Sequence, residues 1–330
     1  MIIQKLISIK EELNLNEINQ LLSSYSFVDY RTYRIKKTFL DNYLFSQIKE
    51  LTKSKSNCLI IARKKEKIIG LITLIDLPWD TDIFGIKMAK IGHIIGGSTD
   101  GQNILIKNEL INSIIQVCKD KKILHLSCRI DVEDFSSFYV LEKNGFNLMD
   151  TVVTYVYDKI KHSIPRIKDI YKVEGFKKDD LTYLRRLAKG SFSKHRFYLD
   201  PHIPQRKADY LYEQWIKNAC LNKKRDRVLI AKKNDKTPVG FLIYRLNERI
   251  FKYTGCRIIG EGLAAISPEG KGAFPSLLKA ALNNEIKSID YAEFDSLIHN
   301  YEAIKVYRKF GLDFVRGKYT FHKWLGDSIQ

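Results

Sequence analysis

The chain has 330 residues, of which 45% are hydrophobic and 28% are charged, a balance typical of a globular protein with a sizeable core. At roughly 150 residues per domain, this length predicts about two domains. The modest glycine and proline content excludes collagen-like and low-complexity architectures. No stretch reaches the ~18 uninterrupted apolar residues of a membrane helix, and Lys5 brings charge too early for the core of a signal peptide. We therefore expect a soluble, cytoplasmic protein without a membrane partner.

Cysteine and histidine spacing indicates neither disulfides nor a metal centre. The five cysteines are dispersed without a C-x-x-C pair, which is typical of reduced, buried thiols. The seven histidines show no H-E-x-x-H or other ligand spacing, so we predict no metal site.

The net charge is +18, from 56 basic and 38 acidic side chains. Such an excess favours anionic partners. Because the basic residues are spread along the chain rather than gathered in one arm, the charge argues against nucleic acid and favours phosphate-bearing small molecules.

The chain contains a repeat. Residues 58–72 and 228–243 each alternate short apolar runs around a polar turn, which predicts a β-hairpin in each. Both copies continue in the same order, with an apolar-periodic helix (103–119 or 273–286), a glycine (Gly145 or Gly311) and an apolar strand (151–157 or 319–324). Units of this length predict a duplicated α/β domain, with a boundary near the basic, proline-containing segment 159–166.

Two stretches of the second copy carry a family resemblance. The first runs Ala264-Ala-Ile-Ser-Pro-Glu-Gly-Lys-Gly-Ala-Phe, and the second, 300–311, contains N-x-x-A-x-x-x-Y at Asn300, Ala303 and Tyr307. Together they resemble the central strand, pyrophosphate loop and cofactor helix of the GNAT superfamily of acyl-CoA-dependent N-acyltransferases, over roughly 167–325. The resemblance implies an α/β (α+β) protein with a tandem duplicated GNAT fold, in which a mixed, mostly antiparallel sheet is flanked by helices. It also implies acetyl-CoA as co-substrate, without a metal.

The loop residues suit a pyrophosphate for physical reasons as well. Gly270 and Gly272 remove side chains where the backbone would approach the anion, and Lys271 adds a positive charge. The helix that follows offers unpaired N–H groups and a positive dipole end. An ordinary strand–helix turn is the alternative interpretation. The loop departs from the family pattern R/Q-x-x-G-x-G/A at Glu269 and Phe274, and we expect Glu269 to point to solvent.

The expected cofactor contacts come from the strand, the loop and the last helix. They are Ala264, Ala265, Ile266, Gly270, Lys271, Gly272, Ala273, Phe274, Asn300, Ala303 and Tyr307.

The first copy lacks these features. An offset of 166 residues superposes Gly145 on Gly311 and Thr154 on Thr320, but it places Leu141 at Tyr307. At the same offset Ser137 stands at Ala303, and Asp134 at Asn300. We therefore expect residues 1–160 to form a degenerate GNAT-like domain without a cofactor site, and residues 166–330 to form the catalytic domain.

Two further motifs narrow the resemblance. W-D-x-x-x-F-G within 77–85 and R-F-x-x-D-P from Arg196 resemble tandem-type enzymes that acetylate nucleotide-linked amino sugars, such as dTDP-fucosamine (dTDP-4-amino-4,6-dideoxygalactose) acetyltransferases. The resemblance implies that Arg196, Asp200 and His202 bind the acceptor. Alternatively, Asp200 only ends a helix and Arg196 is a surface cation, and Trp79 and Phe84 belong to the core.

The resulting prediction is direct transfer of an acetyl group from acetyl-CoA to a primary amine, the amino group of a nucleotide-linked amino-deoxy sugar. The alternatives are a ribosomal or protein N-terminal acetyltransferase and a non-catalytic CoA-binding module; a homodimer is left open. Tyr307 is the predicted general acid, since a phenol with a pKa of about 10 is protonated at neutral pH.

The general base is less defined. Glu261 ranks first, because it lies on the predicted central strand five residues before Ile266. His195, Asp200 and a relay through ordered water are the alternatives. His299 is a further candidate, although we expect it to cap the helix that follows it.

Overall fold

Both predicted hairpins are present. Strands β2 (Cys58–Lys64) and β3 (Lys67–Asp76) pair antiparallel, as do β8 (Asp226–Lys232) and β9 (Pro238–Leu246). In the second turn, the backbone N–H of Thr237 donates to Asp235 Oδ1 at 2.9 Å, which closes the turn locally. The structure is a computed structural model that describes residues 2–6, 15–51, 53–65, 67–97, 100–222, 225–260 and 262–326.

The chain divides into two units, and the first of them is built from two separate segments of the sequence. The N-terminal unit contains the chain up to Asp150 together with the segment from Lys318, and the C-terminal unit contains Thr151–Gly317. Two long strands, β6 (Asn147–Asp158) and β13 (Asp313–Trp324), pass from one unit into the other. Each half of the chain therefore provides the last strand of the other unit's sheet.

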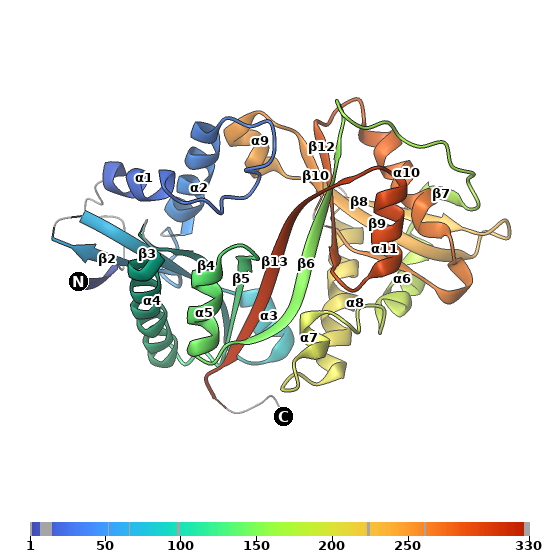
Figure 1. The fold of residues 1–330 in the computed structure, drawn as a ribbon. Helices are drawn as coiled ribbons and strands as arrows, with labels where there is room; N and C mark the ends of the chain where they lie inside the picture. The colour runs from blue at the N-terminus through green and yellow to red at the C-terminus, as the bar shows by residue number, and fades with distance from the viewer. Residues whose placement is uncertain are drawn as a thin grey trace. The chain divides into compact units, whose positions relative to one another are not determined.

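The N-terminal unit has helices on both faces of a sheet. Its remaining elements are β1 (Ile2–Leu6), α1 (Leu15–Ser23), α2 (Lys37–Leu51), α3 (Pro78–Phe84), β4 (Met88–Ile95), α4 (Asp100–Asp120), β5 (His125–Asp131) and α5 (Phe135–Lys143). Within the described part of this unit the strand order is β1-β2-β3-β4-β5-β13, and only β4 and β5 are parallel. Figure 1 shows α4 and α5 on one side of these strands and α1 and α2 on the other.

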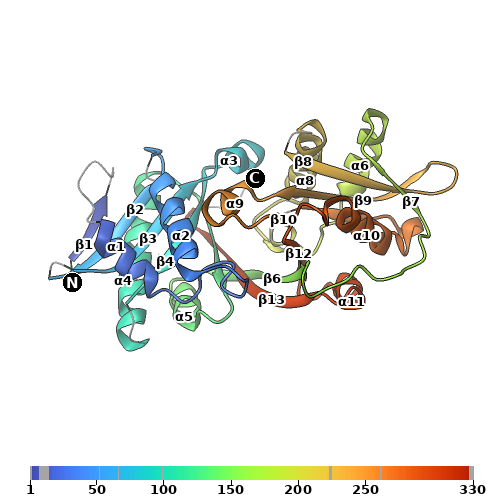
Figure 2. The same cartoon turned by 90° about the horizontal axis from the view of Figure 1, so that it is seen from above.

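The C-terminal unit repeats this plan. Its remaining elements are β7 (Lys172–Gly175), a 3₁₀ turn (Lys178–Asp180), α6 (Leu181–Ala188), α7 (Arg196–Leu199), α8 (Gln205–Leu221), α9 (Glu248–Thr254), β10 (Ile258–Gly260), β11 (Ala264–Ile266), a second 3₁₀ turn (Pro268–Gly270), α10 (Ala273–Glu285), β12 (Tyr291–Leu297) and α11 (Tyr301–Lys309). The order is β7-β8-β9-β10-β12-β6, with β11 on β9, and among the strands that the structure describes here only β10 and β12 are parallel. Figure 2 shows α10 and α11 on one side of β8 and β9, and α6 and α8 on the other.

Strand alternation explains why both faces of this second sheet are covered. On β9, Leu242 and Tyr244 belong to the core cluster that contains α10 and α11. Phe241 and Ile243 are also buried, at 0% and 1% exposure, but they point to the opposite face. A strand buried on both sides reads as a nearly continuous apolar run, which is how the sequence from Pro238 to Leu246 reads.

The observed division differs from the expected domains 1–160 and 166–330. Residues 159–170 are irregular, as expected for a linker. However, 151–158 belongs to the C-terminal unit and the segment from Lys318 belongs to the N-terminal unit. The physical reason is pairing: β6 forms a ladder with β12 from Val152 to Asp158, and β13 forms one with β5 from Lys318 to Trp324.

The cysteines are free thiols, and four of the five are buried. Burial raises the pKa of the Cys118 thiol to about 12, so this thiol is unreactive at neutral pH. Within the part of the chain that the structure describes, no helix has the length and apolar character to span a membrane.

Candidate active site

Two parallel strands separate at the centre of the C-terminal unit. Strands β10 and β12 pair at Ile258–Tyr291 and Ile259–Ala292. After Gly260 the chain shifts, and its continuation β11 pairs with β9. Gly262 lies in this shift, where a Cβ atom would stand 1.3 Å from the carbonyl oxygen of Ile243, so only glycine fits. Glu261, the predicted base, lies outside the described residues.

The edge of β11 that faces away from β9 is open. The backbone N–H of Ile243 donates to the carbonyl of Leu263, and the N–H of Ser267 donates to the carbonyl of Val239, both at 2.8 Å. Odd-numbered residues of β11 therefore bond to β9, and by alternation the N–H and C=O groups of Ala264 and Ile266 point to the other edge.

Strand β12 presents a matching edge. The N–H of Ile298 donates to the carbonyl of Thr151 at 2.9 Å, and the N–H of Lys159 donates to the carbonyl of Asp290 at 3.1 Å. Even-numbered residues of β12 thus bond to β6, and the backbone groups of Glu293 and Asp295 point away from β6. An extended ligand with its own amide groups can bind such open strand edges as an added strand does.

The loop after β11 leads directly into α10. Gly272 has φ = 90° and precedes the first helical residue, a backbone conformation that favours glycine. Gly270 is buried, and a Cβ atom there would lie 2.5 Å from the carbonyl oxygen of Val239. Packing against β9 therefore requires a glycine at this position.

The surface of this loop suits an anion. Lys271 is exposed, and Glu269 is exposed as expected. The hydroxyl of Tyr171 donates to the carbonyls of Glu269 and Lys271, at 3.3 and 3.2 Å, and so holds the loop. The first turn of α10 has no side-chain cap, which leaves its N–H groups available to a negative ligand.

Tyr307 lies beside the open strand edges. Its side chain is 3% exposed, and its hydroxyl donates to the carbonyl of Asp295 at 3.3 Å. Its ring packs against Tyr155, Phe274 and Phe294, with centroids 5.2, 5.8 and 6.0 Å away. Burial, reinforced by the Asp295 carboxylate, raises the pKa of Tyr307 well above its usual value. The hydroxyl therefore keeps its proton at neutral pH.

The core of the C-terminal unit brings most of the predicted cofactor residues together. Tyr307 and Ala273 belong to this cluster, and four half-buried residues pack against it: Ala264, Ile266, Phe274 and Ala303. Ala265 is buried on the opposite face of β11.

Asn300 has a structural role at the start of α11. Its Oδ1 accepts a hydrogen bond from the backbone N–H of Ala303 at 3.3 Å, which is the contact of an N-cap. The expectation that His299 caps this helix is wrong, because the shorter Asn300 side chain occupies that position.

The predicted acceptor residues lie at and after α7. The guanidinium of Arg196 lies 4.4 Å from the centroid of the Phe197 ring. Asp200 is 1% exposed, and its Oδ1 accepts from the backbone N–H of His202 at 3.0 Å. This contact matches the alternative in which Asp200 ends the helix. His195 precedes the first residue of α7, with its ring 5.2 Å from that of Phe192.

In the other motif, W-D-x-x-x-F-G, Phe84 is 1% exposed but Trp79 is 37% exposed. The core interpretation is therefore correct for Phe84 and wrong for Trp79. Gly85 ends α3 with φ = 73°.

A cluster of polar side chains on β12, β6 and β13 was not predicted from the sequence. Thr154 Oγ1 donates to Asp295 Oδ1 at 2.6 Å. Arg316 Nη2 lies 3.4 Å from Thr154 Oγ1 and 3.3 Å from Glu293 Oε1. The signal was present in the repeat: the 166-residue offset places Arg129 at Asp295, a reversal of charge.

The N-terminal unit has different side chains at the positions that the 166-residue offset equates with Asn300 and Tyr307. Asp134 caps α5 as Asn300 caps α11, by accepting from the backbone N–H of Ser137 at 3.0 Å. Lys107, from α4, is 1% exposed and donates to Asp134 Oδ1 at 2.7 Å. Leu141 is fully buried where Tyr307 stands in the other unit.

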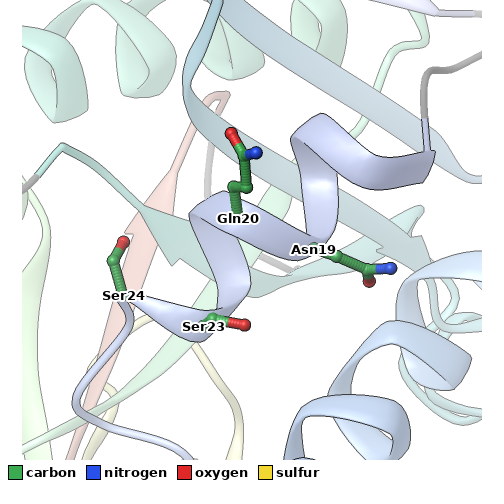
Figure 3. Close-up of a pocket in the computed structure, with 4 residues that line it drawn as sticks. All are labelled: Asn19, Gln20, Ser23 and Ser24. Atoms are coloured by element: carbon green, nitrogen blue, oxygen red, sulfur yellow. The ribbon is translucent and has the colours of Figure 1, made fainter.

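A hollow on α1 is a separate feature of the N-terminal unit. Four exposed, uncharged polar side chains line it, namely Asn19, Gln20, Ser23 and Ser24 (Figure 3). None of the predicted site residues is among them.

The chain matches none of the known protein-family models. It is 22% identical over 277 residues, 81% of its length and 88% of the relative's, to the spore coat polysaccharide biosynthesis protein SpsD of Bacillus subtilis (strain 168).

Solved structures define the fold. The match to a tandem GNAT protein from the clavulanic acid biosynthesis pathway covers 99% of this chain and 100% of that protein, with a TM-score of 0.58 and 10% identity. The match to a GCN5-related N-acetyltransferase from Sphaerobacter thermophilus covers 99% of this chain and 97% of that protein, with a TM-score of 0.66 and 10% identity. The protein therefore has the tandem GNAT fold, as its sequence predicted.

Proposed function

We propose that this protein transfers an acetyl group from acetyl-CoA to a primary amine, and that the C-terminal unit carries the reaction. The observation that supports this most is the pair of open strand edges on β11 and β12, with the Tyr307 hydroxyl beside them.

The residues present fit acetyl-CoA. When bound, the co-substrate supplies an activated acetyl thioester. The backbone groups of Ala264 and Ile266 can bind the amides of its extended arm and hold the carbonyl oxygen of the acetyl group. Lys271 and the first turn of α10 can bind the pyrophosphate. Gly272 allows the chain to enter the helix there, while Gly270 seats the loop on β9.

Tyr307 is the proposed general acid. Its protonated hydroxyl lies at the edge of β12, where it can give a proton to the departing thiolate. Glu261 is the sequence-based candidate for the base, and its role rests on its place in the sequence.

The proposed acceptor is the amino group of a nucleotide-linked amino-deoxy sugar, with Arg196, Asp200 and His202 as candidate contacts. Two observations support it: the similarity to a polysaccharide biosynthesis protein and the net charge of +18, which suits two polyphosphate substrates. The N-terminal unit is proposed to carry no cofactor site, because the 166-residue offset places Leu141 at Tyr307 and Asp134, paired with Lys107, at Asn300.

The test is a thiol-release assay with acetyl-CoA and a panel of amines. The panel contains dTDP-4-amino-4,6-dideoxygalactose, its UDP analogue, glucosamine and a ribosomal-protein N-terminal peptide. We expect thiol release with a nucleotide sugar and little with the peptide. Faster turnover of the peptide than of the nucleotide sugars would show that the acceptor is a protein N-terminus instead. Binding of acetyl-CoA by calorimetry without thiol release from any amine would favour a CoA-binding module instead.

A further inference from the structure

Asp295 is an exposed carboxylate in the middle of the C-terminal unit's sheet. Its neighbours on β12, Ala292 and Phe294, belong to the core cluster that includes α10 and α11. Alternation therefore places the side chains of Glu293 and Asp295 on the opposite face of the sheet. None of the roles assigned above uses this carboxylate.

A directed chain of hydrogen bonds leads to this carboxylate. The Arg316 guanidinium can only donate, so Thr154 Oγ1 accepts from it at 3.4 Å. The hydroxyl proton of Thr154 is then directed to Asp295 Oδ1, 2.6 Å away. Thr154 and Arg316 are held on their strands, with Thr154 3% exposed, so the orientation is fixed before any ligand arrives. Only Oδ1 receives this bond.

Asp295 also adjoins the proposed acid. Its own carbonyl accepts the hydrogen bond of Tyr307, so the backbone of one residue holds the acid while its side chain projects from the sheet. The Tyr307 hydroxyl and the Asp295 carboxylate are therefore both held at the same residue position of β12.

The N-terminal unit provides an internal comparison. At the same offset of 166 residues, Arg129 and Thr320 replace Asp295 and Thr154, and they pair across their strands in the same register. There the Arg129 Nε donates to Thr320 Oγ1 at 3.0 Å. The unit that lacks the tyrosine thus has the same polar pair with its charge reversed, so neither the fold nor the threonine requires a carboxylate.

We propose that Asp295 binds the ammonium group of the acceptor and takes its proton, a proposal that rests on the proposed function. The ammonium gives one proton to the carboxylate, which passes it to water. The neutral amine then attacks the acetyl carbon, so that a C–N bond forms and the C–S bond breaks. Tyr307 protonates the thiolate and recovers its proton from the nitrogen, and the net product is one amide, one thiol and one proton.

Other charged or titratable groups near Asp295 have defined roles. Glu293 pairs with Arg316 at 3.3 Å, and both side chains are about nine-tenths buried. Tyr307 is held protonated by burial, and Tyr155 packs on its ring. Of the two carboxylates, Glu293 is buried and Asp295 is exposed.

The test compares Asp295→Asn with Glu261→Gln, using the panel amine that the wild-type protein turns over fastest. We expect Asp295→Asn to lower kcat/KM by about 10²-fold, the low end for a positioned base, and to remove the acidic limb of its pH profile. We expect the CoA-bound Asp295→Asn protein to lose affinity for dTDP-4-amino-4,6-dideoxygalactose by calorimetry, while its affinity for acetyl-CoA stays within twofold. Asp179→Asn, at an exposed carboxylate before α6, is the matched control.

Thr154 tests the chain of hydrogen bonds. Thr154→Val should lower kcat/KM about tenfold, since the carboxylate loses one donor. Thr154→Ser keeps the hydroxyl and should restore kcat/KM. An unchanged profile in Asp295→Asn, with the limb lost in Glu261→Gln, would assign the base to Glu261. A tenfold loss of acetyl-CoA affinity in Asp295→Asn would show a structural role and overturn the proposal. Absence of turnover by the wild-type protein would instead overturn the proposed function, and this proposal with it.

Discussion

The hydroxyl of Tyr307 has a raised pKa and lies at an open strand edge. A phenol whose pKa is raised by burial stays protonated throughout the neutral range, so its contribution as an acid should not fall as the pH rises toward 9. We predict that Tyr307→Phe lowers kcat by about 10²–10⁴-fold, with little change in acetyl-CoA affinity.

Stopped-flow thiol release and calorimetry measure the two effects separately. Tyr155→Phe is the matched control, because it removes a hydroxyl from the adjoining ring and should leave kcat nearly unchanged. Full turnover by Tyr307→Phe would place the active site elsewhere.

Lys107 is buried in the N-terminal unit, and its contacts are structural. Its ammonium donates to Asp134, Ser136 and Ser137 in an environment with almost no solvent. Burial lowers the pKa of Lys107, although Asp134 opposes the shift. Removing one member of such a pair leaves an uncompensated buried charge.

We therefore predict that Lys107→Met destabilises the protein by about 3–5 kcal/mol in denaturant unfolding. The double variant with Asp134→Asn should recover most of this loss, because asparagine keeps the helix cap without the charge. If the double variant is no more stable than the single one, the ion pair is not the cause.

At the scale of single elements, α5 and α11 begin in the same way from different residues. Asp134 and Asn300 have nearly identical backbone angles, φ = −82° and −84°, and each accepts a hydrogen bond three residues ahead. We predict that Asn300→Ala costs about 1 kcal/mol of stability, whereas Asn300→Asp is close to neutral. Chemical denaturation measures both. Equal losses in the two variants would contradict the capping role.

The hairpins and helices could be predicted from the sequence, because their signals are local. Residues 273–286 were expected to be helical and α10 covers Ala273–Glu285, since the apolar period of a helix is read within one window. The shift between β10 and β11 was not predicted. It depends on the approach of Gly262 to Ile243, a contact between strands that no local window contains.

The candidate site was predictable to a similar degree. Tyr307, Asn300 and Ala303 could be proposed because they form one short motif. Asp295 and Thr154 lie 141 positions apart and meet only after β6 pairs with β12, so composition and spacing could not connect them.

For the molecule as a whole, the exchange of β6 and β13 has the largest effect on how the chain can be divided. Residues 151–157 and 319–324 have the same strand pattern, so alternation alone could not decide which sheet each one completes. Phe321 and Thr320 on β13 are fully buried in the N-terminal unit, which makes this strand part of its core.

We predict that a fragment of residues 1–160 does not fold, because the β5 edge and the apolar surface under Phe321 stay exposed. Adding a peptide of residues 316–326 should restore a folded spectrum in NMR or circular dichroism. A peptide with Phe321→Asp should fail to do so, since it would bury a charge without a partner. A folded 1–160 fragment on its own would refute this prediction.

The exchange of β6 and β13 also determines which unit has all of its residues first during translation. The C-terminal unit needs nothing beyond Gly317, whereas the N-terminal unit waits for the segment from Lys318. The half that is translated first is thus finished last. With about 170 residues between Asp150 and Lys318, translation at 5–20 residues per second imposes a delay of roughly 10–30 s. During this interval the nascent chain carries an unpaired β5 edge, and a chaperone that protects exposed strands would have its longest opportunity to bind there.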